Sequence, residues 1–226
     1  MKEVVVLSGS GMSAPSGVAT FRDARGLWCE FSVEEVATPE AFAQHPQRVL
    51  DFYNRRRLEL AEVEPNAGHY ALAELENRPD TRVTIITQNV DDLHERAGSS
   101  RVVHLHGELI KVRSAENPDD IREIGYTEIQ LGDLCPQGHQ LRPHIVWFGE
   151  IPMRFDEAQR LVQQADILLV VGTSLSVYPA ASLAGFAPQH AQKFFIDLEG
   201  EHCPPEFMHV QQSAEVGVPQ AILHFL

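Results

Sequence analysis

The sequence predicts an α/β fold in which a doubly wound parallel sheet carries a small inserted lobe. A β-branched run at 4–7 ends in a glycine-rich turn, and further apolar runs of similar length alternate with segments of helical patterning, as in buried parallel sheets. Two stretches break this alternation. We therefore expect a Rossmann-type domain built from 1–27, 66–109 and 143–226, and a small lobe built from 28–65 and 110–142.

Short runs rich in Val, Ile and Leu predict the strands. They lie at 4–7, 82–86, 101–105, 167–171 and 193–196. Segments with helical periodicity lie between them and predict helices. These helices cover 46–60, 67–76, 155–164 and 218–225, and Pro219 suits the first turn of the last one. The stretch 110–142 is polar and irregular, and it is assigned to the small lobe.

The composition restricts the class of protein. Of 226 residues, 43% are hydrophobic and 22% are charged, and no apolar run approaches the roughly 20 residues that a membrane helix needs. No secretory signal precedes the first strand, and three cysteines do not suit a disulfide framework. The net charge of −14 opposes nucleic acid and attracts basic protein segments. We expect a cytoplasmic monomer that binds neither membrane nor nucleic acid.

The turn at 9–13, Gly-Ser-Gly-Met-Ser, follows the first strand with little side chain in the way, so its backbone N–H groups can approach a pyrophosphate. Glycine turns after strands are also common for steric reasons alone. Ala14 takes the place of the third glycine in the G-x-G-x-x-G dinucleotide pattern, a change that the pattern tolerates. The turn by itself leaves both interpretations open.

Further blocks of residues decide between these interpretations. They are 16–22 (Ser-Gly-Val-Ala-Thr-Phe-Arg), 26–28 (Gly-Leu-Trp), 88–91 (Gln-Asn-Val-Asp), 104–107 (His-Leu-His-Gly), 146–150 (Val-Trp-Phe-Gly-Glu), 172–179 (Gly-Thr-Ser-Leu-Ser-Val-Tyr-Pro) and 213–215 (Ser-Ala-Glu). In this order and spacing they resemble the sirtuin family over nearly the whole chain. The resemblance implies one sirtuin-type unit whose cleft, between the Rossmann-type domain and the small lobe, binds NAD and an acyl-lysine together.

The resemblance also implies which residues bind NAD, and it places nicotinamide against Phe21, Arg22, Asn89 and Asp91. Asp197 follows a predicted strand, where its carboxylate can accept hydrogen bonds from both ribose hydroxyls and repel a 2′-phosphate; a helix-capping role explains it equally well. The expected NAD-binding set is Gly9, Ser10, Gly11, Met12, Ser13, Thr20, Phe21, Arg22, Trp28, Gln88, Asn89, Asp91, Gly172, Thr173, Ser174, Asp197 and Ala214.

The resemblance makes His106 the general base and includes Asn89 and Asp91 in the catalytic set. His106 would accept a proton from a ribose hydroxyl, so that the sugar oxygen attacks the intermediate formed when the acyl oxygen displaces nicotinamide. An imidazole with an ordinary pKa of about 6.5 suits that role. A lone histidine at a strand end is more often structural, and the surrounding blocks are what favours catalysis. His104 is interpreted as a structural residue.

Tyr53 and Arg56 lie three residues apart on a predicted helix, so their side chains share one face and can converge on a carboxylate. The pair resembles the Tyr-x-x-Arg of the sirtuin branch that removes succinyl and malonyl groups, and Ala37 matches the small residue that widens the pocket there. A solvated arginine face at 55–57 with a packed Tyr53 is the alternative. The expected acyl-lysine and peptide contacts are Ala37, Tyr53, Arg56, Val146, Phe148 and Gly149.

Sirtuins usually hold a structural zinc ion with two cysteine pairs in the small lobe. Cys135 is the single cysteine in the corresponding region, and 112–114 lacks the first pair, whereas a closed zinc site needs about four N or S ligands. Cys135, His139 and a carboxylate can form a partial site at most, and a polar loop explains them more simply. We expect no structural zinc and no other metal, with activity retained because zinc is not catalytic in that family.

The expected function is NAD-dependent removal of acyl groups (succinyl, malonyl and also acetyl) from protein lysine, which gives nicotinamide, O-acyl-ADP-ribose and free lysine. Two alternatives stay open. In the first alternative, the chain is a sensor that binds NAD or ADP-ribose without turnover. In the second, it is an enzyme that hydrolyses NAD or transfers ADP-ribose with the same nicotinamide pocket. The dependence of nicotinamide release on an acylated peptide distinguishes the three.

Overall fold

The structure is a computed structural model that describes residues 1–19 and 30–225. In this part of the chain, the main sheet has six parallel strands in the order β3-β2-β1-β7-β8-β9. They are β1 (Lys2–Ser8), β2 (Thr81–Thr87), β3 (Val102–His104), β7 (Ile167–Val171), β8 (Gln192–Ile196) and β9 (Met208–Val210). The chain starts in the middle of the sheet, builds outward to β3, and returns to build the other half. The predicted doubly wound parallel sheet is confirmed; β9 is an additional short edge strand.

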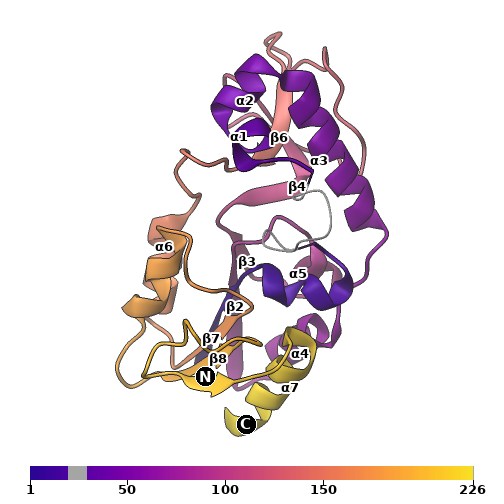
Figure 1. Cartoon of the computed structure of the whole chain (residues 1–226). Coiled ribbons are helices and arrows are strands. Elements are labelled where there is room, and N and C mark those ends of the chain that lie inside the picture. The colour runs from indigo at the N-terminus through magenta and orange to yellow at the C-terminus, as the bar shows by residue number, and fades with distance from the viewer. Residues whose placement is uncertain (20–29, 226) are drawn as a thin grey trace.

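Helices cover both faces of this sheet, as its continuously apolar strands predict. They are α4 (Ala67–Glu76) and α7 (Ala214–Phe225) on one face, and α6 (Phe155–Val162) and the 3-10 helix η4 (Ala180–Phe186) on the other. Val4 points into the core under α4 and α7, and its neighbour Val5 points into the core under α6 and η4, because successive strand residues face opposite sides. Figure 1 shows α6 on one side of the strands and the α4–α7 pair on the other.

Local sequence signals predict the start of helix α4 correctly but not the start of helix α7. Helix α4 has the predicted bounds: the Asn66 side chain accepts a hydrogen bond from the N–H of Gly68, and His69 Nδ1 accepts one from the N–H of Asn66 at 3.2 Å, which caps the first turn. Helix α7 begins at Ala214 and not at 218, so Pro219 lies inside the helix and not in its first turn. No helix in the ranges 1–19 and 30–225 is long and apolar enough to cross a membrane.

The sequence predicts 110–142 only as a polar and irregular part of the small lobe, and in the structure this stretch contributes to a second sheet. Among the described residues this sheet is antiparallel and three-stranded, in the order β5-β4-β6. Its strands are β4 (Gly107–Ser114), β5 (Ile121–Glu123) and β6 (Leu141–Ile145), and its accompanying helices are α1 (Val33–Val36), α2 (Pro39–Gln44) and α3 (Pro46–Ala61). The three helices, β4 and β6 share a core that includes Phe52 and Leu109. The whole lobe forms the upper part of Figure 1, away from both termini.

A buried polar contact ties α3 to the small sheet. Arg57 is fully buried and donates hydrogen bonds to the carbonyl oxygen of Leu109 at 2.7 Å and to Asn54 Oδ1 at 2.8 Å. The Asn54 amide also pairs with the backbone N–H and C=O of Ile129, at 2.9 and 2.8 Å. Burial lowers the pKa of Arg57 to about 10. The arginine run at 55–57 is therefore not a uniformly solvated face, although Arg55 stays exposed.

Candidate functional site

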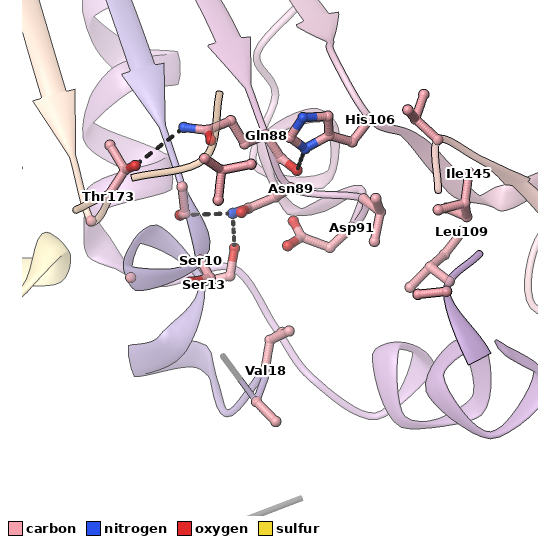
Figure 2. A pocket seen from close by; sticks show the side chains of 18 of the residues that line it. Ser10, Ser13, Val18, Gln88, Asn89, Asp91, His106, Leu109, Ile145 and Thr173 are labelled. Atoms are coloured by element: carbon pink, nitrogen blue, oxygen red, sulfur yellow. Dashed lines mark hydrogen bonds between the residues drawn. The ribbon is translucent and has the colours of Figure 1, made fainter. Parts of the chain in front are cut away.

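A cleft of about 870 Å³ opens where the carboxyl ends of the parallel strands meet the small lobe. Loops after β1, β2 and β7 line one wall, and residues of α3, β4 and the segment after β6 line the other. Figure 2 shows Asn89 and Asp91 of the first wall together with the apolar side chains of Leu109 and Ile145 from the other wall. Ligands of doubly wound sheets bind at this edge, where the crossover connections leave toward opposite faces, and the volume is in the range of cofactor sites.

Two loops that touch backbone to backbone form the floor of the cleft. The N–H of Gly11 donates to the carbonyl oxygen of Gly172, and that of Gly9 to the carbonyl oxygen of Val171, both at 2.9 Å. A Cβ at Gly11 would lie 2.7 Å from the Cα of Gly172, and Gly172 itself has a φ of 58°, which side chains disfavour. The close approach of these two loops therefore requires glycine in each of them.

The predicted phosphate-binding turn already uses most of its N–H groups. Those of Gly9, Gly11, Met12 and Ser13 donate to backbone carbonyls of the protein. Met12, in the 3-10 helix η1 (Ser10–Met12), is fully buried in the core beneath α4. The expectation that the whole turn offers its N–H groups to a pyrophosphate is therefore corrected: in this conformation the turn contributes mainly bare backbone to the wall.

His106 lies between the two sheets, after β3 ends and directly before β4 begins. Its Nδ1 lies 2.9 Å from the carbonyl oxygen of Gln88, and because a carbonyl only accepts, Nδ1 carries the hydrogen and Nε2 the lone pair. Burial lowers the pKa of His106, and the bond to Gln88 opposes this effect. The imidazole is therefore neutral at neutral pH, half-buried at the cleft, and able to accept a proton through Nε2.

Gly107 makes this position of His106 possible. Its φ is 82°, and β4 approaches β6 so closely here that a Cβ would overlap the carbonyl oxygen of His144. The carbonyl oxygen of His106 accepts a hydrogen bond from the N–H of Val146 at 2.9 Å. The backbone of His106 is thus held by the small sheet, while its imidazole is held by Gln88 in the loop after β2.

Asn89 and Asp91 follow β2 and are almost fully buried. Asn89 Nδ2 donates to the carbonyl oxygen of Gly9 at 3.0 Å and to Ser13 Oγ at 3.1 Å, so both amide hydrogens are used and Oδ1 is left to accept from a ligand. Burial raises the pKa of Asp91, and hydrogen bonds from Ser13 and from the N–H of Leu93 oppose the rise. The Leu93 bond, at 3.2 Å, starts the short helix α5 (Leu93–Arg96).

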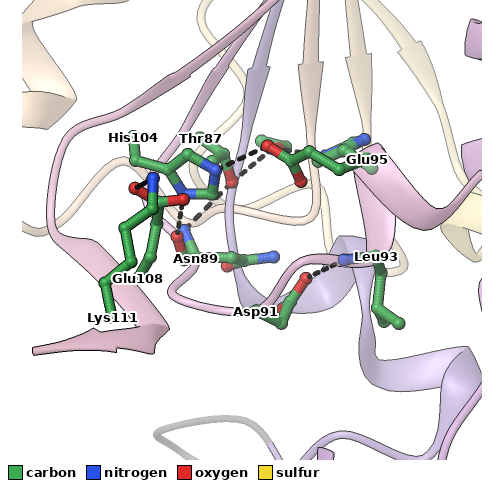
Figure 3. Close-up of polar contacts among 10 residues, drawn as sticks. Thr87, Asn89, Asp91, Leu93, Glu95, His104, Glu108 and Lys111 are labelled. Carbon is green, nitrogen blue, oxygen red and sulfur yellow. Dashed lines mark hydrogen bonds and ion pairs between the residues drawn. The ribbon is translucent and has the colours of Figure 1, made fainter. Parts of the chain in front are cut away.

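His104 supports this loop from behind, as Figure 3 shows. Its Nε2 lies 2.8 Å from Glu95 Oε1 and its Nδ1 lies 3.3 Å from the carbonyl oxygen of Asn89. Both neighbours are acceptors, so only the protonated ring donates to both. Burial lowers the pKa of His104, but the contacts with Glu95 outweigh burial and the net pKa is raised. These contacts agree with the structural role expected of His104.

The end of the cleft inside the small lobe is lined by Ala37, Tyr53 and Arg56. Tyr53 is 1% exposed, and its hydroxyl oxygen accepts a hydrogen bond from Trp147 Nε1 at 3.0 Å. Burial raises the pKa of Tyr53 to about 12, so the hydroxyl stays protonated. Burial lowers the pKa of Arg56, with Tyr53 and Asp91 opposing the change; a guanidinium stays charged at neutral pH.

Most of the predicted site residues meet in this one cleft. They are Gly9, Ser10, Gly11, Ser13, Gln88, Asn89, Asp91, His106, Gly172, Thr173, Ser174 and Asp197, together with Ala37, Tyr53, Arg56, Val146, Phe148 and Gly149. Gln88 also donates to Thr173 Oγ1 at 3.2 Å, which joins the loops after β2 and β7. Asp197 Oδ1 accepts from the N–H of Glu199 at 3.0 Å, so it stabilises a turn and does not cap a helix.

Six of the predicted residues are not part of the described lining. Met12 and Ala214 are buried in the core, and the Ala214 carbonyl packs against Gly68. Thr20, Phe21, Arg22 and Trp28 lie outside the described residues.

Some polar residues of the wall were not predicted as site residues, and two of them belong to a block that the sequence analysis had singled out. Trp147 and Glu150 stand in the block 146–150, and both line the cleft. Val18, Leu109 and Ile145 add apolar surface. The block itself is the signal that draws attention to Trp147, whereas the contacts of Glu150 depend on strands that the sequence did not predict.

Residues 1–19 and 30–225 contain no group of three or more His, Cys, Asp or Glu side chains placed to hold a metal ion. Cys135 lies in a turn that backbone hydrogen bonds close. Its N–H donates to the carbonyl oxygen of His139 at 2.8 Å, and the N–H of Gly138 donates to the carbonyl oxygen of Cys135 at 2.9 Å. The shape of this turn is therefore held by the chain itself.

A sequence profile of the Sir2 family matches residues 9–179 of this chain. Two similar curated proteins carry the name NAD-dependent protein deacylase. One, from Bacteroides thetaiotaomicron, is 54% identical over 202 residues, which cover 87% of this chain and 86% of that protein. The other, from Helicobacter pylori, is 52% identical over 216 residues, which cover 95% of this chain and 93% of that protein.

Solved structures of similar fold include complexes with nucleotides. A mutant Sir2 homologue bound to ADP-ribose has a TM-score of 0.88 at 38% identity and covers 98% of this chain and 90% of that one. A Sir2 homologue bound to NAD has a TM-score of 0.87 at 38% identity, with 98% and 88% covered. A Sir2 structure with a deacetylated p53 peptide and 3′-O-acetyl-ADP-ribose has a TM-score of 0.81 at 26% identity, with 98% and 93% covered.

Proposed function

This chain belongs to the Sir2 family, and on that premise we propose that it is a protein deacylase that acts on acidic acyl groups of lysine. NAD-dependent protein deacylation is the activity that its curated relatives carry in their names. The narrower proposal, a preference for succinyl or malonyl over acetyl, is supported by Tyr53 and Arg56 at the inner end of the cleft. An acylated lysine of a protein is the expected partner, and we propose that one chain suffices, since a single chain builds both walls.

The residues of the cleft fit NAD. Bare backbone at Gly9, Gly11 and Gly172 borders a space large enough for a dinucleotide, and Asn89 Oδ1 and the Asp91 carboxylate offer acceptors to an amide N–H. When bound, NAD supplies the ADP-ribosyl group that takes the acyl group, with nicotinamide as the leaving group. The overall reaction consumes one molecule of water, and its products are nicotinamide, O-acyl-ADP-ribose and free lysine.

His106 is the proposed general base. Its Nδ1–H is fixed on the carbonyl oxygen of Gln88, so Nε2 is the nitrogen that accepts a proton from a ribose hydroxyl. Its lowered pKa keeps the ring neutral and ready for this step. Asn89 and Asp91 hold the nicotinamide end of NAD in place, and they lie in the same loop after β2 as Gln88. One short loop thus orients both the base and the leaving group.

The acyl preference follows from charge. A succinyl or malonyl group brings a carboxylate, which a guanidinium binds with two parallel hydrogen bonds and a protonated phenol with one. Tyr53 stays protonated and Arg56 stays charged in the pocket. An acetyl group has no carboxylate to offer to either side chain. Ala37, which is buried at the same end, leaves room for the longer acyl chain.

The experiment compares nicotinamide release from NAD with acetyl-, succinyl- and unmodified lysine peptides. We expect acyl-dependent release that His106→Ala removes. Arg56→Met is expected to lower the succinyl-to-acetyl ratio of kcat/KM roughly 10- to 150-fold, the range of one hydrogen bond to a charged group. Arg55→Met is the matched control, because Arg55 lies next in sequence but is exposed and pairs with Glu30 and Glu59.

Three results would overturn parts of this proposal. Release without any acylated peptide indicates NAD hydrolysis or ADP-ribosyl transfer. Binding of NAD without release for any peptide indicates a sensor. Acyl-dependent release with the same ratio in wild type and Arg56→Met refutes the acidic preference and leaves the deacylase intact.

A further inference from the structure

The hydroxyl of Tyr53 has a fixed direction. Trp147 Nε1 lies 3.0 Å from it, and an indole N–H can only donate, so the Tyr53 oxygen is the acceptor. Tyr53 and Trp147 are 1% and 2% exposed, so water does not compete for this bond. The hydroxyl hydrogen must then point elsewhere, and Tyr53 lines the cleft. A carboxylate is an acceptor only and suits that hydrogen.

Trp147 is itself held on several sides. The Arg142 guanidinium carbon lies 3.3 Å from the centre of the indole ring, a stacked cation–π contact, and Phe42 packs at 5.3 Å between ring centres. The backbone N–H of Trp147 donates a hydrogen bond to Glu150 Oε2 at 2.8 Å. The indole therefore cannot turn away from Tyr53 without losing its contacts with Arg142 and Phe42, and the backbone bond to Glu150 holds the segment that carries the indole.

Glu150 joins this arrangement to the small sheet. Arg142, on β6, donates to both of its carboxylate oxygens at 2.8 and 3.1 Å, and Arg113, on β4, donates to one of them at 3.0 Å. These ion pairs lower the pKa of Glu150 against the opposing effect of burial. The half-buried carboxylate of Glu150 thus has donors for both of its oxygens, from two arginines and one backbone N–H. It fixes the segment after β6 at the acyl end of the cleft.

We infer that Trp147 is a positioning residue for the selection of acidic acyl groups. By occupying the Tyr53 oxygen as acceptor, its N–H directs the Tyr53 hydrogen toward the acyl carboxylate, and the Arg142–Glu150 pair keeps the indole in place. This inference rests on the proposed preference for acidic acyl groups. An acetyl group makes no use of the Tyr53 hydrogen, so Trp147 acts on the choice between substrates and not on the chemical step.

The test is a double-mutant cycle with Trp147→Phe, which removes the N–H but keeps an aromatic ring, and Tyr53→Phe, which removes only the hydroxyl. We expect Trp147→Phe to lower the succinyl-to-acetyl ratio of kcat/KM roughly 2- to 12-fold, the range of one neutral hydrogen bond, mainly through KM for the succinyl peptide. In the Tyr53→Phe background the same change should have no further effect on the ratio, because the two residues act through one bond.

The outcomes separate the inference from the function on which it rests. Equal loss with both peptides, or additive effects in the double variant, would mean that Trp147 only supports the fold, and the inference fails. An unchanged ratio in Trp147→Phe with a lowered ratio in Tyr53→Phe also refutes it. If Tyr53→Phe and Arg56→Met both leave the ratio unchanged, the acidic preference itself is wrong. If Trp147→Phe folds poorly, an unchanged ratio in Tyr53→Phe still refutes the inference, because Trp147 acts only through the Tyr53 hydroxyl.

Discussion

Replacing Gly107 by alanine tests whether the backbone next to the proposed base needs glycine. Its φ of 82° disfavours an L-residue by about 1–2 kcal/mol. The added Cβ would also overlap the carbonyl oxygen of His144, and relieving such an overlap by a backbone shift adds about 1–3 kcal/mol. We therefore expect Gly107→Ala to lower the free energy of unfolding by about 2–5 kcal/mol.

Gly132→Ala is the matched control. Gly132 also has a positive φ, of 99°, but nothing lies within 4 Å of the Cβ position, so only the backbone term of about 1–2 kcal/mol applies. Urea unfolding followed by circular dichroism gives both changes on one scale. The difference between the two variants measures the overlap with β6 alone.

The same variant should lose activity beyond its loss of stability. Moving β4 away from β6 displaces the backbone of His106, and a misplacement of about 1 Å at a reacting group can lower the rate about 100-fold. Nicotinamide release is measured well below the unfolding transition, so that folded enzyme is compared with folded enzyme. Equal destabilisation by the two glycine variants, or a fully active Gly107→Ala enzyme, would refute this reasoning.

Two predictions concern pH. Because burial lowers the pKa of His106, the acid limb of kcat/KM against pH should have its midpoint below 6.5, and the rate should fall as pH drops through it; a midpoint at or above 6.5 contradicts the assignment. Burial lowers the pKa of His69 from 6.5 to about 4, so its contribution to stability is complete above pH 6.5 and is lost between there and pH 4. The loss of stability amounts to about 3 kcal/mol at most. His69→Asn should therefore reduce the dependence of the urea midpoint on pH between 4 and 6.5. An unchanged slope in this variant would contradict the contribution of His69.

The main sheet could be predicted because its signals are local. Runs such as 167–171 are apolar throughout, since both faces of a central parallel strand are buried. Helix α4 has the bounds that its Asn66 cap indicates. The side-chain set of the cleft followed from family blocks, and it meets at the edge where a doubly wound sheet places its ligands.

The small sheet escaped prediction because charges interrupt its alternation. Lys111 and Arg113 on β4 are only partly exposed, and each is neutralised by a carboxylate, Lys111 by Glu108 at 2.8 Å and Arg113 by Glu150 at 3.0 Å. The sequence shows these two charged residues, but it does not show the carboxylates that neutralise them within the sheet. Trp147 was missed as a site residue for the same reason, because its role depends on contacts made across the lobe.

The paired glycine loops at the floor of the cleft come from parts of the chain that are synthesised at different times. Gly9 and Gly11 leave the ribosome early, but Gly172, the surface against which they rest, is made much later. A nascent or truncated chain that stops before β7 has one half of the floor and lacks the other. We therefore expect NAD to bind the folded sheet and not a chain that stops before β7, and a ligand that binds the native state alone stabilises that state.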